Sequence, residues 1–229
     1  MNKALKAIIS VVLLAVIGLL VYLIVASIME PVNFNKEKDA RSAVAVQRLK
    51  DIRTLEVAYK GATGHYTADI DSLILFYNTG KMDIIMQVGS NDDSLAVVNT
   101  EKLKKANRKI TPQEMYERYL KGENLVFSIK NSIDVKDTLF HGRTDFIADS
   151  LKYIPFSGGQ VVETDAIVKT VSGVEVPLFE AKMPYKALLK GMDNQLRINL
   201  DADCRASNRY EGLQVGSVTA PNNNAGNWE

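Results

Sequence analysis

The chain has 229 residues, 46% of them hydrophobic and 24% charged, with 28 Lys and Arg against 27 Asp and Glu. This composition is typical of a folded globular protein and excludes a largely disordered chain. The near-neutral charge gives no support to nucleic-acid binding, which needs a strongly basic face. The single cysteine, Cys204, excludes an intramolecular disulfide and a multi-cysteine zinc site. We expect Cys204 to be buried and inert, with an intermolecular disulfide as the alternative.

An apolar run near the N-terminus, residues 7–28, contains no charged residue and no proline. As a helix rising 1.5 Å per residue it is about 33 Å long, enough to cross a hydrocarbon core of about 30 Å. The run is longer than the apolar part of a cleaved signal peptide. We therefore expect a retained signal anchor that contacts the lipid bilayer, with cleavage near Ala26 as the alternative.

The charges that flank this run predict its orientation. Lys3 and Lys6 precede it without any acidic residue, whereas Glu30 follows it. The positive-inside rule then places the N-terminus in the cytoplasm and the rest outside. Because Pro31 is expected to interrupt the helix, we predict three parts: a cytoplasmic stub and transmembrane helix (1–29), a short linker (30–35), and an extracytoplasmic α+β domain with a polar C-terminal tail (36–229).

A second helical pattern follows the predicted linker. Apolar residues recur there every three or four positions, at Ala45, Leu49, Ile52, Leu55 and Tyr59. This spacing predicts a helix that packs one apolar stripe on its own domain, with a coiled-coil seam as the alternative. Gly61 and Gly64 are expected to end it.

Residues that are typical of helix N-termini predict further helices. Asp69 can cap a short helix through Leu73 and Phe76, and the segment 91–94 is expected to be a turn. The sequence Thr-Pro-Gln-Glu at 111–114 has a capping hydroxyl, a proline at the first helical position and a glutamate that can reach back to the cap. That helix should end near Gly122, and one further short helix is expected at 145–154.

A basic run precedes this capping sequence. Its members, five cations within eight positions, are Lys102, Lys104, Lys105, Arg108 and Lys109. We expect them to form a solvated helix face, with attraction to anionic lipid as the alternative.

Three later segments have the alternation of strands. Leu125, Phe127 and Ile129 alternate with Val126, Ser128 and Lys130, as in a half-buried strand. The segments 160–170 and 174–183 flank residues 171–173 and form a plausible hairpin, and Leu196, Ile198 and Leu200 alternate with polar residues. Helices followed by strands predict an α+β fold with an antiparallel sheet.

The residues that usually perform catalysis form no recognisable set. The two histidines, His65 and His141, occur beside glycines and are expected in exposed turns. The chain has no phosphate-binding Gly-Lys-Ser/Thr loop and no Gly-x-Ser-x-Gly motif. We therefore expect no enzyme, with no catalytic, cofactor-binding or metal-binding residue and no cofactor; a hydrolase without a recognisable motif is the least favoured alternative.

Acidic residues also occur in close pairs, at Asp69 and Asp71, Asp92 and Asp93, and Asp201 and Asp203. No pair continues as a twelve-residue calcium loop, so we expect helix capping and turn formation. Asp201-x-Asp203 is the pair to test first for calcium. Trp228, the only tryptophan, is expected to dock the tail onto the domain, with a disordered tail as the alternative.

The N-terminal third resembles type IV pilins and the pseudopilins of type II secretion. The resemblance covers residues 1–76 and consists of a basic N-terminus, an uncharged membrane helix, the helical stripe with Tyr59, and then Gly64-His65-Tyr66 and Leu73. It implies a long helix, a Gly-x-Tyr-Pro-like turn and an antiparallel sheet. The chain departs from the family because its apolar run has no Glu and Thr67 replaces the usual Pro, so we expect no processing by a prepilin peptidase.

These observations favour a single-pass protein of the bacterial inner membrane with its C-terminal domain in the periplasm. We expect the domain to serve protein–protein assembly, with an unidentified envelope protein or with further copies of the chain. The alternative function is a membrane-tethered module that binds a small ligand, a glycan or calcium. A convergent acidic pocket around Asp201 and Asp203 would favour that alternative.

Overall fold

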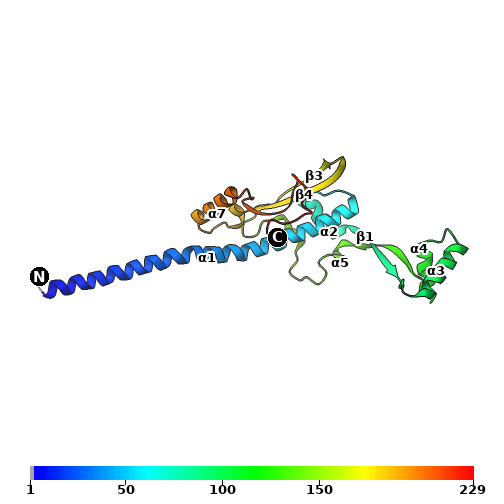
Figure 1. Ribbon diagram of the computed structural model, residues 1–229, viewed down its shortest axis with the longest axis horizontal. Helices are drawn as coiled ribbons and strands as arrows, with labels where there is room; N and C mark the ends of the chain where they lie inside the picture. The colour runs from blue at the N-terminus through cyan, green and yellow to red at the C-terminus, as the bar shows by residue number, and fades with distance from the viewer. Residues whose placement is uncertain (1–2) are drawn as a thin grey trace. The chain divides into compact units, whose positions relative to one another are not determined.

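The computed structural model describes residues 3–229, with side chains from Val11 onward. It contains helices and antiparallel strands (Figure 1), which confirms the α+β class. The chain forms two compact units: one is the chain up to Thr54 together with Ser150–Glu229, and the other is Leu55–Asp149. The single domain expected at residues 36–229 is therefore divided. Residues 55–149 form one unit with its own pair of strands, and the residues before and after this segment form the other unit.

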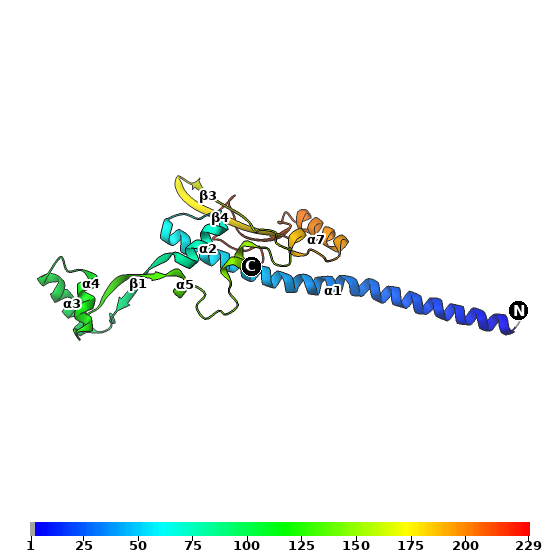
Figure 2. The same cartoon turned by 180° about the vertical axis from the view of Figure 1, so that it is seen from behind.

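The first helix, α1 (Lys3–Thr63), continues through the position of the predicted linker (Figures 1 and 2). The linker at residues 30–35 was a wrong prediction, since Pro31 lies inside the helix. Proline removes one N–H donor, but the hydrogen bonds of the turns on both sides can still hold the helix together. Phe34 is buried, so this segment is packed against the fold. The apolar run and the packed stripe thus belong to one helix.

A glycine turn ends α1 at the predicted place. Gly64 follows the last helical residue with φ of 88°, a conformation that glycine adopts without strain. Its N–H donates to the carbonyl of Lys60 over 2.8 Å. Gly61, which was expected to share this role, lies inside α1 instead.

The unit Leu55–Asp149 continues after this turn with helices and one antiparallel ribbon. Its elements are α2 (Ile70–Thr79), β1 (Lys81–Val88), α3 (Ser94–Ala106), α4 (Pro112–Leu120), β2 (Phe127–Asp134) and α5 (Val135–Thr138). Asp69 caps α2, as predicted, by accepting from the N–H groups of Asp71 and Ser72. Strands β1 and β2 pair over their whole length, from Lys81 opposite Asp134 to Val88 opposite Phe127.

The segment between β1 and β2, residues 89–126, is called the tip below. Thr111 and Glu114 form the predicted capping box at the start of α4. Helices α3 and α4 close over a small apolar core at the end of the ribbon. The buried members of this core are Val88, Met115, Leu125, Phe127 and Ile129.

The other unit contains a three-stranded antiparallel sheet. Its elements after α1 include β3 (Glu163–Val171), β4 (Val174–Pro184), α6 (Tyr185–Leu188), α7 (Asn194–Ala206) and β5 (Gly212–Gly216), with the strand order β3-β4-β5. The predicted hairpin is confirmed as β3 and β4. Ser172 and Gly173 form its two-residue turn with φ of 53° and 84°, as a tight turn between twisted strands requires.

Two predicted elements differ from the structure. The alternation at Leu196, Ile198 and Leu200 belongs to α7 rather than to a strand. Asp193 caps this helix by accepting from the Leu196 N–H over 2.7 Å, and Leu196 and Leu200 share a face because they are four residues apart. The helix expected at 145–154 is only a single 3₁₀ turn, η1 (Ala148–Lys152).

Candidate functional site

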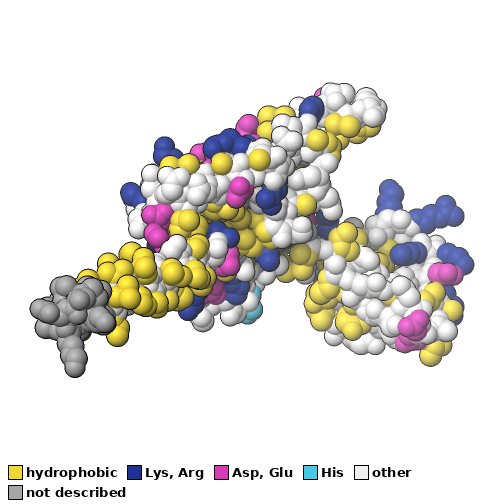
Figure 3. Space-filling model, turned by 60° about the vertical axis from the view of Figure 1, so that its left-hand side comes forward, with side chains coloured by type: hydrophobic (Ala, Val, Ile, Leu, Met, Phe, Trp, Pro, Cys, Tyr) yellow, Lys and Arg dark blue, Asp and Glu magenta, His cyan; other side chains and the backbone are white. Residues whose placement is uncertain are grey.

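The N-terminal half of α1 is the most unusual surface of the described chain. The exposed fraction of its apolar side chains reaches 74% at Leu14 and 69% at Tyr22. None of the most apolar window is buried, and its mean hydropathy is 3.0. Figure 3 shows hydrophobic side chains covering this part of the helix. By length and composition, this is one helix that is able to cross a membrane.

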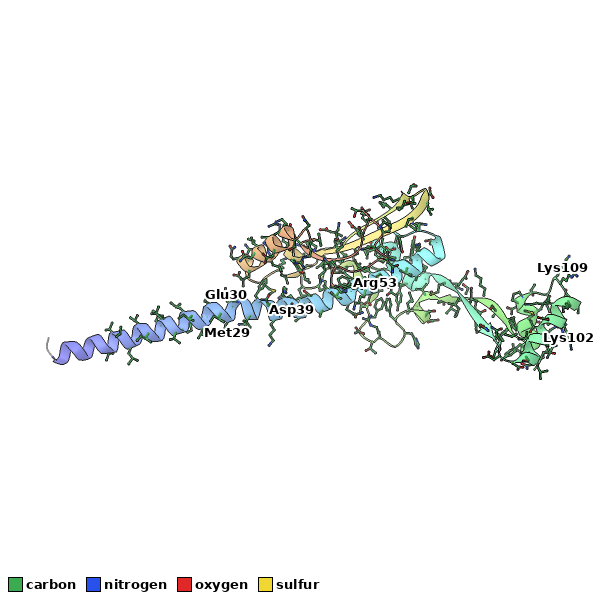
Figure 4. All side chains as sticks on the ribbon, in the orientation of Figure 1. Met29, Glu30, Asp39, Arg53, Lys102 and Lys109 are labelled. Carbon is green, nitrogen blue, oxygen red and sulfur yellow. The ribbon has the colours of Figure 1, made fainter. Side chains whose placement is uncertain are left out.

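The uncharged run ends at Met29. Glu30, the next residue, is the first charged side chain after residue 10 (Figure 4), and beyond it Val32 is a further exposed apolar residue. Residues 1–2, and the side chains of Lys3 and Lys6 that the orientation prediction uses, lie outside the described part. A bilayer that covered the apolar half of α1 would therefore end close to Glu30.

In the second half of α1, the buried apolar residues lie along one side of the helix. The predicted stripe is buried, with exposed fractions of 0% at Ala45, Leu49, Ile52 and Leu55. This burial confirms the internal packing stripe and contradicts the alternative of an exposed coiled-coil seam. Tyr59, the last member, is half-buried and meets the ring of Phe76 edge-on at 5.3 Å.

Three arginines of α1 bind backbone carbonyls of the same unit. Arg41 donates to the carbonyl of Lys190 over 2.9 Å, and Arg48 donates to the carbonyl of Tyr153. Arg53 donates to the carbonyl of Asn224 over 3.2 Å. A guanidinium group presents several N–H donors in a fixed plane, which suits it to holding loops on a helix. These contacts fasten α1 to the loops that surround the sheet.

The arginines also border a group of exposed apolar side chains, called the α1 patch below. The guanidinium of Arg41 lies 5.1 Å from the ring centre of Phe156. The α1 patch consists of Val44, Tyr153, Phe156 and Val161, each between 44% and 51% exposed. Tyr153 and Val161 form an isolated β-bridge, and Val44 lies one turn from both Arg41 and Arg48.

The backbone of the patch loop is tightly built. Phe156 has φ of 60°, a rare conformation for a bulky residue. Ser157 beside it is fully buried, and its hydroxyl donates to the Ile154 carbonyl over 2.7 Å and accepts from the Gln160 N–H over 2.9 Å. A loop that holds an aromatic ring outward at the cost of a strained backbone is typical of a functional surface.

The C-terminal tail is docked, as predicted for Trp228. The indole nitrogen of Trp228 is buried, and the Asn227 N–H donates to the Gln214 carbonyl over 3.0 Å. Arg53 binds the side-chain carboxylate of Glu229, the last residue, over 2.7 Å. The tail therefore adds to the edge of the sheet beside β5.

A buried glutamate stabilises the turn after α1. Glu56 is 1% exposed, and its carboxyl group accepts from the Thr67 N–H over 3.2 Å. Burial raises the pKa of Glu56 to about 8, while the hydrogen bond from Thr67 acts in the opposite direction. Thr67 is the position where the resembling family usually has proline, so the N–H that a proline would lack has a specific partner here.

Two of the acidic pairs have the predicted structural roles. Asp69 caps α2, and Asp93 caps α3 by accepting from the N–H groups of Leu95 and Ala96. The Asn124 side chain donates to Asp93 over 2.6 Å, and this hydrogen bond is the largest cause that lowers the pKa of Asp93. These carboxylates are therefore engaged within the fold.

The third pair does not form a convergent acidic pocket. Asp201 is buried on α7 and pairs with Arg197 over 2.5 Å, whereas Asp203 is exposed. Asp201 lies at a hollow of about 420 Å³. The other lining residues are Pro184, Lys186, Arg209, Tyr210 and Glu211. The Oδ1 atom of Asp201 is buried without a hydrogen-bond partner. The hollow is therefore not acidic, since its two acids, Asp201 and Glu211, are balanced by two cations, Lys186 and Arg209.

The remaining sequence candidates have structural positions that agree with their predictions. His65 and His141 are exposed, and Cys204 is buried. Burial is also the main cause that raises the pKa of the Cys204 thiol, which keeps it protonated. Among the described residues, no three His, Cys, Asp or Glu side chains form a group that could hold a metal ion.

Sequence reasoning missed the α1 patch and β1. Tyr153, Phe156 and Val161 are isolated apolar residues in a loop, and only the fold brings this loop to the face of α1 that carries Arg41 and Arg48. The strand β1 did have a signal, since Met82, Ile84, Met86 and Val88 alternate with more exposed residues. Comparisons with family models, with curated proteins and with solved structures found no match.

Proposed function

We propose that the chain is a non-enzymatic, single-pass envelope protein that presents a pilin-like α+β part for protein–protein assembly. The observation that carries this proposal is α1 itself. One half of the helix has an apolar surface on all sides that is fully exposed, and the other half packs into the fold. An apolar helix of this length is stable in a hydrocarbon core, where its backbone groups are satisfied internally.

The location follows from the same helix and from the flanking charges. Lys3 and Lys6 favour a cytoplasmic N-terminus, which places the folded part in the periplasm of a bacterial cell. Because α1 is continuous, the membrane-spanning half and the packed half are rigidly joined. A long N-terminal helix, a glycine turn and antiparallel strands also follow the layout of the pilin-like proteins that the sequence resembles.

The assembly part of the proposal rests on the α1 patch. Four half-exposed apolar side chains beside two arginines have the composition of a protein interface, where aromatic and arginine side chains are enriched. The partner is an envelope protein or a second copy of the chain. The alternative function, binding of a small ligand, a glycan or calcium, has less support because Asp201 and Asp203 lie on different sides of α7.

Two measurements on cell membranes test the location. We expect the full-length protein to stay with the membranes through a carbonate wash, and protease added to spheroplasts to remove the folded part. Recovery in the wash supernatant would disprove the anchor. If protease removed the folded part only after lysis of the spheroplasts, the folded part would lie in the cytoplasm and the predicted orientation would be wrong.

Crosslinking in intact cells tests the assembly. The double variant Val44→Ser with Phe156→Ser should lose the crosslinked species of the wild type and keep its thermal stability, because both side chains are about half exposed. The matched control is Val168→Ser, an exposed valine on β3. Unchanged crosslinking in the patch variant would exclude this surface as the interface.

A further inference from the structure

Within the tip, helix α3 has one side that is buried and another side that is exposed to solvent. The covered side consists of Ala96 and Thr100, which are buried, and Leu103, which packs against the core of the tip. Thr100 fixes this side further, because its hydroxyl accepts from the Val126 N–H over 2.8 Å. The rotation of α3 in the tip is therefore set by packing.

The open side of α3 combines apolar and cationic side chains in one line. Leu95 is 71% exposed and Val98 is 45% exposed. Lys102 and Lys105 follow at helical spacing on the same face, and both are exposed. The apolar pair thus lies at the N-terminal end of a helix face and the cations at its C-terminal end.

The cations continue beyond the helix. Arg108 and Lys109 lie in the loop after α3 and are exposed, and Figure 4 labels Lys102 and Lys109 on the tip. Figure 3 shows Lys and Arg side chains gathered on one side of the tip. The helix dipole accounts for Lys104 and Lys105, which lie in the last turn of α3, but not for the cations after the helix.

Two acidic residues lie near these groups: Glu101 on α3, and Glu123, which borders a hollow together with Lys102 and is 3.4 Å from Arg118. Glu101 is 3.8 Å from Lys105, and the side chains of the two residues are 64% and 81% exposed. Such an exposed pair is weak and leaves Lys105 able to contact another anion. The face therefore has a clear excess of positive charge next to an exposed apolar pair.

We propose that this face of the tip binds the surface of an anionic phospholipid bilayer. Leu95 and Val98 would enter the boundary between headgroups and acyl chains, and Lys102, Lys105, Arg108 and Lys109 would lie at the lipid phosphates. A soluble anion would use the cations alone, and protein interfaces are depleted in lysine, whereas a bilayer surface uses both the lysines and the exposed apolar pair. This contact is separate from the membrane helix, because it belongs to the soluble part of the chain.

The experiment uses the full-length chain in nanodiscs of phosphatidylcholine, mixed with vesicles and separated by flotation. Vesicles that contain 30% phosphatidylglycerol should capture the nanodiscs, and vesicles of pure phosphatidylcholine should not. Capture should weaken steeply in 0.5 M salt, because salt screens exposed charges. Absence of capture by the anionic vesicles would overturn the proposal.

Variants identify the surface. Lys102→Glu with Lys105→Glu should weaken capture at least about 25-fold, since each lysine contributes roughly fivefold at an anionic surface. Leu95→Ser with Val98→Ser should weaken it at least about tenfold, since binding scales with the buried apolar area. All four side chains are exposed, and an unchanged melting curve will verify that the variants fold.

The matched control is Lys81→Glu with Lys130→Glu, an equal change of charge on the ribbon outside the tip. These lysines are 66% and 69% exposed and already face Asp134 and Asp83. Equal loss of capture in the control and tip variants would show a general charge effect and overturn the assignment. Displacement of the vesicles by inorganic phosphate at constant ionic strength would identify a free-anion site and contradict a bilayer surface.

Discussion

The two halves of α1 differ in how they meet their surroundings, although they form one helix. In the N-terminal half, residues 11–28, apolar side chains cover the whole circumference and are exposed. In the second half, apolar side chains form one stripe that is 0% exposed at Leu49, Ile52 and Leu55. A single neighbouring fold can bury only a one-sided stripe, so the second half suits a folded neighbour, whereas the surface of the N-terminal half is of the kind that suits a hydrocarbon environment.

The largest expected effect comes from charging the N-terminal half. Val16→Arg with Leu20→Arg places two cations in the middle of the apolar run, where each costs about 2.5–3.5 kcal/mol of membrane insertion. We expect this variant to appear in the carbonate-wash supernatant or to be degraded. Immunoblotting of the pellet and supernatant measures the change.

The second half of the same helix provides the control. Val44→Arg with Val57→Arg adds the same charge at residues that are 45% and 49% exposed, so membrane retention should not change. Equal retention of both double variants would remove the distinction between the two halves. Loss of both from the pellet would point to general misfolding instead.

Emptying the packed stripe should have the next largest effect. Ile52→Ala removes a fully buried aliphatic side chain and should lower the free energy of unfolding by about 2–5 kcal/mol. Chemical denaturation of the detergent-solubilised chain measures this loss. Val57→Ala, a half-exposed position on the same helix, should change the stability by less than about 0.5 kcal/mol. Similar stabilities of the two variants would contradict the burial of the stripe.

The second half of α1 also differs from the apolar half because it contains a buried acidic residue, Glu56. Between residues 11 and 29, the apolar half has no ionisable side chain apart from Tyr22. Burial raises the pKa of Glu56 to about 8, above the value of 4.5 for an exposed glutamate. The folded state therefore keeps a proton that the unfolded state releases, so the contribution of Glu56 to the stability is greatest below about pH 4.5 and falls as the pH rises toward 8. The slope should approach about 1.4 kcal/mol per pH unit.

Replacement of this carboxyl group isolates its contribution. Glu56→Gln keeps an oxygen that can accept from Thr67 but cannot ionise, so the fall in stability between pH 5 and pH 8 should become shallower. Glu117→Gln, at an exposed position on α4, should keep the wild-type slope. Denaturation curves at four pH values would measure how the free energy of unfolding changes with pH. The same dependence on pH in wild type and Glu56→Gln would contradict a protonated Glu56.

Much of this fold could be predicted because local signals agreed with the tertiary structure. The caps at Asp69 and Thr111, the hairpin at Ser172 and the stripe around Ile52 each rely on neighbouring residues. Residues 30–35 were misjudged because a proline inside a helix is costly but can be tolerated where adjacent turns are secure. The division into two units could not be predicted, since it depends on contacts between segments that are distant in sequence, the chain up to Thr54 and Ser150–Glu229.

The candidate surfaces also differ in how far they could be predicted from the sequence. The apolar half of α1 could be recognised from composition alone, and the basic run of the tip was visible in the sequence. The α1 patch was not, because Phe156 and Val44 are distant in sequence. The pairing of Leu95 and Val98 with Lys102 required the burial of the opposite face of α3, which follows from packing and not from periodicity.

The smallest expected effect concerns the polar contact of the second half of α1 with the C-terminal tail. The hydrogen bond from Arg53 is the largest cause that lowers the pKa of Glu229, so the contact is present at neutral pH and is lost as the pH falls through a value below 4.5. Arg53→Gln should lower the exchange protection of the Asn227 and Gly216 amides a few-fold, with little change in melting temperature. Lowering the pH should reduce protection in the wild type and have less effect in the variant, after correction for intrinsic exchange. Arg118→Gln removes a comparable exposed pair with Glu123 in the other unit and should leave these amides unchanged. Full protection in Arg53→Gln would show that Trp228 and the backbone bonds beside β5 are sufficient to hold the tail.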